Sequence, residues 1–292
     1  MTVLEVIQRS AEFLAKKGVE SPRLQVELLL AHVLQLPRLQ LYLNFERQLS
    51  EKELDSLREL VQRRGRREPL QHLAGSVNFC GLEIEVTRDA LIPRPETECL
   101  AERAWNHLGK RPVPTEGGGS STHPRVLDVG TGTGCLVLAV AAHAPQAEYV
   151  AIDLSASALA LARRNAERLG LSSRGRFIQS DGFLGLSKEP RFDLILSNPP
   201  YVPTDEIETL EPEVRLHDPR MALDGGQDGL LFYRLLATEA PAFLQPDGLL
   251  MAEFGAGQAA AIQDILAREG WRTLEIGRDL SHIERFVVAC PG

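Results

Sequence analysis

The sequence lacks the features that mark secreted, metal-binding and membrane proteins. Its 292 residues include only four cysteines, which lie far apart, without a CxxC pair or a Cys/His cluster at zinc spacing. Cysteines of this kind are typical of reduced thiols in the cytosol. The N-terminus has no basic region followed by an apolar run, and the longest apolar stretches are too short to span a membrane. We therefore expect a soluble cytoplasmic protein with no metal site and no membrane partner.

Excess basic charge is also missing. The formal net charge is −8, and residues 1–90 carry equal numbers of acidic and basic side chains, so the deficit falls in residues 91–292. This balance argues against direct binding of nucleic acid and favours a basic partner for the C-terminal part. With 43% hydrophobic residues, the length predicts two domains, or one large α/β domain with an appendage.

The first 70 residues predict helices. Apolar residues at spacings of three and four form two stripes, Leu4, Ile7, Ala11 and Leu14, then Leu24, Leu28, Ala31 and Leu34. Ser21-Pro22 is a start signal for the second helix, and Ser50 with Glu53 matches the capping box of a third. That third helix ends in the basic group Arg63, Arg64, Arg66 and Arg67. A solvated face favoured by the helix dipole is the simplest interpretation, and a partner-binding patch is the alternative.

The spacing of the apolar residues changes after Gly75 from a helical period to the alternation of a strand. Leu82, Ile84 and Val86 alternate as in one strand of a short hairpin, and a proline-stiffened turn over residues 91–98 then leads into a helix near Glu98–His107. Residues 110–124 are rich in Gly, Pro and Ser, and we expect a flexible surface insertion around the glycine-rich stretch 117–120.

Strands and helices alternate after Arg125. The strands expected are Arg125–Val129, Tyr149–Ile152, Gly175–Gln179, Phe192–Ser197, Gly248–Glu253, Arg272–Ile276 and Arg285–Ala289. The helices expected between them are Gly134–Ala144, Ala156–Leu169, Gly229–Phe243 and Gly257–Glu269. This α/β pattern predicts a parallel sheet covered on both faces, with its ligand site at the carboxyl ends of the strands.

Three motifs fall at those strand ends. Val126-Leu-Asp-Val-Gly-Thr-Gly-Thr-Gly134 is a strand that enters a glycine turn and then a helix, but Cys135 stands where a dinucleotide fingerprint needs glycine. Asp153 ends the next strand and can accept hydrogen bonds from both hydroxyls of a ribose, although a helix-capping role is the alternative. Asp181 ends the third strand and could meet an adenine amino group, with Phe183 beside the ring.

Together with Asp128, this series resembles the class I S-adenosylmethionine-dependent methyltransferases. The resemblance implies a seven-stranded, mostly parallel sheet and S-adenosyl-L-methionine as cofactor, with S-adenosyl-L-homocysteine as product. The cofactor-binding residues that it implies are Asp128, Gly130, Thr131, Gly132, Thr133, Gly134, Asp153, Asp181, Gly182, Phe183 and Asn198. Gly182 departs from some relatives, which carry an aromatic residue there.

The fourth strand runs directly into Asn198-Pro-Pro-Tyr201. A planar amino group next to a carbonyl or a ring is a poor nucleophile because its lone pair is delocalised. The side-chain oxygen of Asn198 and the backbone carbonyl of Pro199 could orient such an NH₂ group and favour its pyramidalisation. Pro200 stiffens the turn, and Tyr201 would lie against the flat face of the substrate. A tight turn after a buried strand is the structural alternative.

Further motifs narrow the resemblance. Pro69-Leu-Gln-His-Leu-Ala-Gly75, Leu91-Ile-Pro-Arg-Pro-Glu-Thr-Glu98 and Ala222-Leu-Asp-Gly-Gly226, followed by Gly229-Leu-Leu-Phe-Tyr233, occur in order around those above. The chain thus resembles the PrmC/HemK family of peptide chain release factor N5-glutamine methyltransferases over nearly its whole length. The resemblance implies methylation of the glutamine in the Gly-Gly-Gln motif of release factors. It assigns substrate contacts to Asn198, Pro199, Pro200 and Tyr201, and Arg94 could brace the glutamine loop.

We expect an N-terminal helical substrate-recognition domain over residues 1–75, a hairpin and Pro-Arg-Pro linker over 76–98, and the methyltransferase domain over 99–292. Two other readings stay open. One is a related methyltransferase that acts on a ribosomal-protein glutamine or on an exocyclic amine of nucleic acid. The other is a non-catalytic S-adenosylmethionine-binding or adaptor protein, against which the intact Asn198-Pro-Pro-Tyr201 argues.

Overall fold

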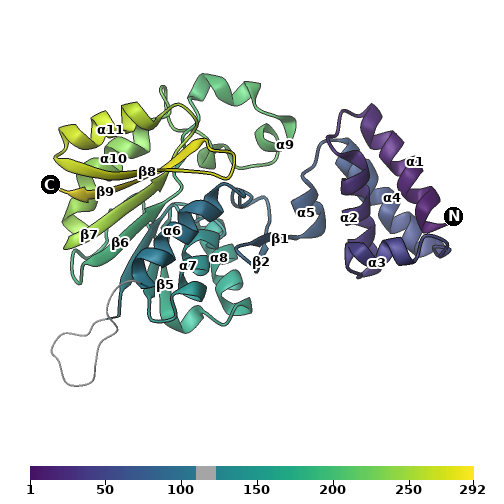
Figure 1. Cartoon of the computed structure of the whole chain (residues 1–292), viewed down its shortest axis with the longest axis horizontal. Coiled ribbons are helices and arrows are strands. Elements are labelled where there is room, and N and C mark those ends of the chain that lie inside the picture. The colour runs from purple at the N-terminus through teal and green to yellow at the C-terminus, as the bar shows by residue number, and fades with distance from the viewer. Residues whose placement is uncertain (110–122) are drawn as a thin grey trace. The chain divides into compact units, whose positions relative to one another are not determined.

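A computed structural model describes residues 1–109 and 123–292 (Figure 1). The predicted insertion around 117–120 therefore lies mostly outside the described residues. The chain forms two compact units, one of Met1–Ser76 with Glu211–His217 and one of Val77–Leu210 with Asp218–Gly292. No helix within the described ranges is both long and apolar enough to cross a membrane. All four cysteines are free thiols.

The first unit is helical. Its N-terminal helices are α1 (Val3–Lys16), α2 (Pro22–Leu34), α3 (Arg38–Leu43), α4 (Glu51–Gly65) and α5 (Leu70–Ala74). The predicted capping box of α4 is present, because the Ser50 hydroxyl accepts from the Glu53 N–H and the Glu53 carboxylate accepts from the Ser50 N–H. α2 does begin at Pro22, but Ser21 is left-handed and makes no capping bond.

The apolar stripe predicted for α2 is half right. Ala31 is buried and Leu34 packs against the core of this unit, but Leu24 and Leu28 are exposed. Val26, Leu29 and Leu30 are fully buried in their place. Glu27 is also buried, and it accepts hydrogen bonds from three side chains, those of Arg23, Arg38 and Tyr42. The sequence of α2 is so nearly continuously apolar that its periodicity does not show which face is buried. The buried carboxylate of Glu27, whose hydrogen bonds are satisfied, marks the face that turns inward.

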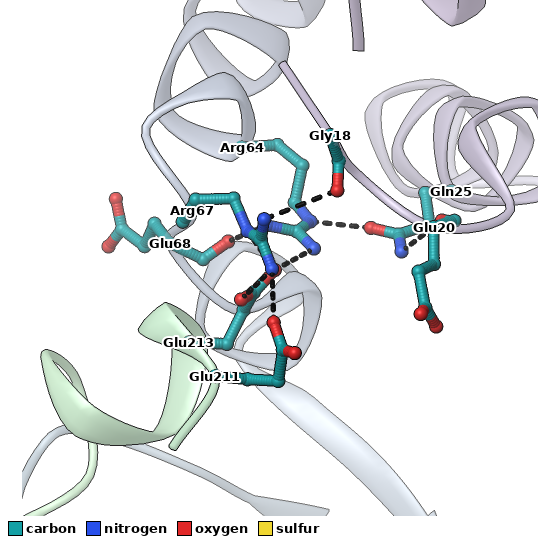
Figure 2. A network of polar contacts seen from close by, with 8 residues as sticks. All are labelled: Gly18, Glu20, Gln25, Arg64, Arg67, Glu68, Glu211 and Glu213. Atoms are coloured by element: carbon teal, nitrogen blue, oxygen red, sulfur yellow. Dashed lines mark hydrogen bonds and ion pairs between the residues drawn. The ribbon is translucent and has the colours of Figure 1, made fainter. Parts of the chain in front are cut away.

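The first unit also includes a short piece of distant sequence. Helix α9 (Pro212–Arg215) belongs to it, although it follows the predicted substrate motif by a dozen residues. Glu213 accepts from Arg64 and Arg67, each at 2.6 Å, and Arg67 also pairs with Glu211 at 2.8 Å (Figure 2). Arg64 is 4% exposed, so the predicted solvated face at the end of α4 is wrong for this residue. Its carboxylate partner came from a segment that showed no helical pattern in the sequence.

The second unit begins with a hairpin, β1 (Ser76–Phe79) and β2 (Leu82–Glu85), followed by α6 (Thr97–Gly109). Within the described part of the chain, seven strands then form one sheet in the order β5-β4-β3-β6-β7-β9-β8. Their bounds are β3 (Arg125–Val129), β4 (Glu148–Asp153), β5 (Gly175–Gln179), β6 (Phe192–Ser197), β7 (Leu244–Glu253), β8 (Trp271–Arg278) and β9 (Glu284–Pro291). β9 is antiparallel to β7 and to β8, and the four other pairs of neighbouring strands in this sheet are parallel. The expected mostly parallel sheet is confirmed.

Helices cover both faces of this sheet (Figure 1). The main ones are α7 (Cys135–His143), α8 (Ala156–Arg168), α10 (Leu231–Glu239) and α11 (Ala259–Arg268). Alternate residues of a strand enter different cores, so Val126 packs with α6 and α7, whereas Leu127 packs with α10 and α11. One short β-bridge, from Val202 to Asp224, ties together the ends of the loop that leads through α9.

The strand order reverses between β3 and β6. From β3 the chain proceeds outward through β4 and β5, and it then returns to place β6 on the other side of β3. Val129 at the end of β3 is in register with Ile152 of β4 and with Ser197 of β6. The predicted motifs at the ends of these strands therefore meet at the switch point, where open α/β sheets bind their ligands.

Candidate active site

The glycine turn begins directly after β3. Gly130, Gly132 and Gly134 have φ values of +73°, +55° and +80°, a region that other residues rarely adopt. Gly134 caps α7, and a Cβ there would lie 3.1 Å from Leu138 and 3.2 Å from Ala162. Glycine is thus required for the turn and also for the packing of α7 against α8. The turn leaves the N-terminus of α7 facing the switch point.

Asp153 joins this turn to the end of β4. Its carboxylate accepts from the N–H of Gly132 and from that of Ser155, each at 2.9 Å. Each carboxylate oxygen keeps acceptor capacity after one such bond. The helix cap that was the alternative for Asp153 is wrong, because Ser155 is the N-cap of α8. Asp153 instead joins the glycine turn to the start of α8, and it remains able to hold a pair of hydroxyl groups.

Asp128 lies beneath the turn and is almost fully buried. It accepts from the Thr131 hydroxyl at 2.6 Å. The pKa of this carboxyl is raised to about 7, chiefly by burial and to a smaller extent by the negative charge of Asp153, while the hydrogen bond from Thr131 opposes the shift. A cationic group bound nearby would favour the ionised form.

A cavity of about 560 Å³ opens at this edge of the sheet, a size within the range of small-molecule sites. Most predicted site residues line it: Arg94, Asp128, Gly130, Thr131, Gly132, Thr133, Asp153, Asp181, Gly182, Asn198, Pro199 and Pro200. The structure thus brings together the glycine turn and the Asn198-Pro-Pro-Tyr201 loop, which are separated by more than 60 residues in the sequence.

Three predicted residues lie elsewhere. Gly134 is in the cap of α7 rather than in the cavity wall. Phe183, expected beside an adenine ring, is 3% exposed and stacks on Phe243 at a centroid distance of 4.9 Å. Tyr201 packs against the core on the α10 and α11 side, and burial raises its pKa to about 12. We expected both rings at the ligand, but the apolar core of the sheet takes them up instead.

Aliphatic residues provide the wall in their place. Leu235 and Leu236 of α10 line the cavity, as does Leu154 after β4. Gly182 is left-handed, and a Cβ there would lie 3.3 Å from Leu235. Glycine therefore suits both the left-handed backbone and the close approach to Leu235 at this position. The sequence offered one signal for this wall, the Gly229-Leu-Leu-Phe-Tyr233 motif at the start of α10.

Asn198 stands where β6 ends. Its side-chain nitrogen donates to the Thr97 hydroxyl at 3.2 Å. Its side-chain oxygen is buried and has no hydrogen-bond partner among the described residues. A buried acceptor is seldom left unpaired, so this oxygen points to a donor that the free chain does not supply. The backbone of Pro199 lines the cavity beside it.

Arg94 lines the cavity as expected, but its guanidinium already has a partner. It pairs with Asp218 at 2.5 Å, and Asp218 also accepts from the N–H of Ile92 at 3.3 Å. The Asp218 side chain has no exposed surface, and burial raises its pKa while the charge of Arg94 opposes that shift. Asp218 fixes Arg94 against the cavity and was missed, because no sequence pattern marks the segment that carries it.

The loop between β6 and α10 supplies the rest of the rim. Thr204, Pro219, Met221 and Ala222 line the cavity, and the Thr204 hydroxyl donates to Asp224 at 2.6 Å. The only sequence pattern within this loop is Ala222-Leu-Asp-Gly-Gly226, which belongs to the family resemblance. The loop therefore forms a wall of the candidate site rather than a simple connection.

Two family models match the chain, the PrmC N-terminal domain over residues 5–75 and the methyltransferase small domain over residues 118–216. Relatives of near-equal length carry the name release factor glutamine methyltransferase. The protein from Geobacter sulfurreducens is 44% identical over 98% of this chain and 95% of its own. The one from Deinococcus radiodurans is 41% identical over 99% of this chain and 98% of its own.

Solved structures share the fold of the second unit. A methyltransferase from Pyrococcus furiosus matches with a TM-score of 0.51 and 20% identity, over 73% of this chain and 90% of its own. The hMettl16 catalytic domain, in complex with an RNA hairpin, matches with a TM-score of 0.53 and 17% identity, over 72% of this chain and 76% of its own. These similarities concern the fold alone.

Proposed function

Because the chain belongs to the release factor glutamine methyltransferase family, we propose that its cavity holds S-adenosylmethionine beside the glutamine side chain of a release factor. The reaction is the transfer of a methyl group to the N5 amide nitrogen of that glutamine. The observation that supports the placement most directly is the buried, unpartnered side-chain oxygen of Asn198 at the cavity that the glycine turn also lines.

The residues at the glycine end fit the proposed cofactor. Asp153 would accept from the ribose hydroxyls, Asp181 lies at the next strand end for the adenine, and Leu154 and Leu235 supply an apolar wall. The ionised form of Asp128 would attract a cationic group near Thr131, and such a group would in turn lower the raised pKa of this buried carboxyl. When bound, S-adenosylmethionine supplies the methyl group on an activated sulfonium.

The residues at the Asn198 end would prepare the amide nitrogen. The Asn198 oxygen and the Pro199 carbonyl accept from the two N–H groups of the glutamine amide and so fix its plane. These bonds strengthen as the nitrogen pyramidalises, which selectively stabilises the transition state. Pro199 cannot offer a competing N–H, and Pro200 stiffens the loop. Tyr201 would support this loop from the core side, and Arg94, held by Asp218, would border the substrate.

The first unit, whose N-terminal part matches the PrmC N-terminal domain, would help bind the release factor. Residues 1–90 are neutral overall, whereas the charge of −8 lies with residues 91–292. A basic, ribosome-binding protein would be attracted to the acidic catalytic part. Because release factors work on ribosomes, the proposed reaction takes place in the cytoplasm.

The test is methylation with labelled S-adenosylmethionine offered together with purified release factor, ribosomal proteins and DNA. We expect label on the release factor, and none on a release factor in which alanine replaces the Gly-Gly-Gln glutamine. Label on a ribosomal protein or on DNA instead would support the alternative targets. Binding of S-adenosylhomocysteine without any label transfer would favour the non-catalytic alternative.

Asn198→Ala is the decisive variant. It should lose most of its turnover and keep its cofactor affinity within a few fold, because its hydrogen bond matters chiefly as the nitrogen pyramidalises. Single-turnover methylation at saturating cofactor measures the chemical step directly. An unchanged rate would mean that Asn198 only ends its strand.

A further inference from the structure

Two buried side chains stand behind Asn198. Thr97 is the first residue of α6, and Glu253 is the last residue of β7. Each is 2% exposed. Thr97 accepts from the Asn198 nitrogen at 3.2 Å. Burial raises the pKa of Glu253, and hydrogen bonding by the side chains of Thr97 and Asn198 opposes that rise, so both side chains face the carboxylate. Three side chains from three distant parts of the sequence thus form one buried polar cluster.

The cluster determines which way the Asn198 amide points. The two ends of an amide have nearly the same shape, so hydrogen-bond partners decide which end is oxygen. An ionised carboxylate can only accept, and the Thr97 hydroxyl can accept from Asn198 while it donates to Glu253. The cluster therefore draws the nitrogen inward. A flipped amide would set its oxygen against the carboxylate.

Glu253 does not itself line the cavity, whereas Asn198 and Thr97 do. The carboxylate therefore has no place from which to touch a substrate, and its effect must pass through Asn198. One of its oxygens, Oε2, is buried with no partner among the described residues. Keeping such a group in the core destabilises the fold, so we expect the group to have a functional role that compensates for this cost.

We propose that Glu253 and Thr97 are positioning residues that lock the Asn198 amide with its oxygen toward the substrate. The proposal rests on the proposed function for its catalytic meaning, while the lock itself is a property of the free protein. Without this lock the Asn198 amide could flip. Its NH₂ group would then face the N–H groups of the substrate amide, which need a hydrogen-bond acceptor.

The kinetic test uses Glu253→Gln, which preserves shape but can donate as well as accept, so it stabilises either orientation of Asn198. We expect kcat to fall at least tenfold, with KM for S-adenosylmethionine within about twofold. Thr97→Val should lower kcat in the same way, and Thr97→Ser, which keeps the hydroxyl, should restore most of it. This matched pair decides the matter if Glu253→Gln fails to fold. Full kcat in Thr97→Val would overturn the proposal.

A second readout is independent of activity. In ¹⁵N-labelled protein, the side-chain amide signals of Asn198 should shift as Glu253 titrates, and burial raises the pKa of Glu253 to about 7. Other ionisable groups whose charge acts on Glu253, or on which its charge acts, include Glu96, Arg285, Tyr201, Tyr233 and Cys135. Burial raises the pKa of Tyr201 and Cys135 to about 12, and Tyr233 and Arg285 also titrate far above neutrality.

The titration near neutral pH should lose most of its amplitude in Glu253→Gln. It should persist in Glu96→Gln and in Asp128→Asn, which removes a second carboxyl at the cavity with a pKa raised to about 7. A titration of full amplitude in Glu253→Gln, or none in the wild type, would overturn the lock. These signals do not require a substrate. A wild type that shows the titration but methylates no release factor would therefore refute the proposed function while leaving the lock intact.

Discussion

At the scale of single residues, Asp153 combines a structural and a proposed binding role. Its carboxylate orders Gly132 and the start of α8, so its removal affects the glycine turn as well as the ribose contacts. Loss of a charge-assisted pair of hydrogen bonds should weaken binding by about 2–3 kcal/mol, or roughly 30–150-fold.

We therefore expect Asp153→Ala to lose S-adenosylhomocysteine affinity by that factor in calorimetric titration. Asp264→Ala, at an exposed position on α11, is the matched control and should bind as the wild type does. An affinity of Asp153→Ala within twofold of the wild type would remove Asp153 from the site.

The buried carboxyl of Asp128 should make stability depend on pH. Its pKa in the folded protein is about 7, above the ordinary value for an unfolded chain, so the folded state holds the proton more tightly. The contribution of this group to the free energy of unfolding is fully present below about pH 4. It falls by on the order of 3 kcal/mol as the pH rises to 7. Glu253, with a pKa also raised to about 7, acts in the same direction.

Asp128→Asn cannot ionise but can still accept from Thr131. The free energy of unfolding is measured by chemical denaturation between pH 4.5 and 8 without cofactor. The two carboxyls make it decline with rising pH in the wild type, and in the variant about half of that decline should be absent. Parallel declines in variant and wild type would show that Asp128 does not carry the effect.

The contrast between predicted and missed residues has a physical basis. Asp153 and Asn198 were predicted because each directly ends an apolar strand, and the ends of parallel strands must converge. Thr97 and Glu253 were missed because their importance comes from contacts across the fold. The Thr97 contact with Asn198 spans 101 positions in the sequence, and no local pattern encodes it.

At the scale of elements, every strand after Arg125 was predicted, most within a few residues, because strands buried on both faces read as apolar runs between helices. Helix α9 was not predicted. It has only four residues, and its position depends on the arginines of α4. Phe183 and Tyr201 were placed at the ligand because the motifs put them at strand ends, but an aromatic ring next to a sheet can equally fill the core.

The buried Arg64 should hold α9 in place. Methionine keeps the apolar stem of arginine but leaves Glu213 without one of its 2.6 Å partners (Figure 2). In Arg64→Met we expect the amides of Arg215 and Leu216, which bond to Glu211 and Pro212, to exchange hydrogen roughly 10–100-fold faster.

The matched control is Arg66→Met, at an exposed position on the same turn of chain, which should leave this exchange unchanged. Equal exchange in the two variants would mean that the segment is held by other contacts.

At the scale of the whole molecule, the chain passes between its two units three times, near residues 76, 210 and 217. The loop that lines the cavity therefore has its middle in the helical unit. Anchoring of this loop and recognition of the release factor are two separate ways in which the helical unit could support methylation, and one experiment can distinguish them.

A chain that begins at Ser76 retains every residue lining the cavity, so it should still bind S-adenosylhomocysteine. It should methylate intact release factor at least tenfold less efficiently, because the proposed recognition surface is gone. A short Gly-Gly-Gln peptide never reaches that surface, so its kcat/KM should fall much less. The full-length double variant Arg64→Met/Arg67→Met loosens the loop but keeps the surface. If this variant, rather than the truncated chain, loses activity on the peptide, the helical unit acts through the loop. If the truncated chain methylates intact release factor as efficiently as the full chain, the helical unit does not recognise the substrate.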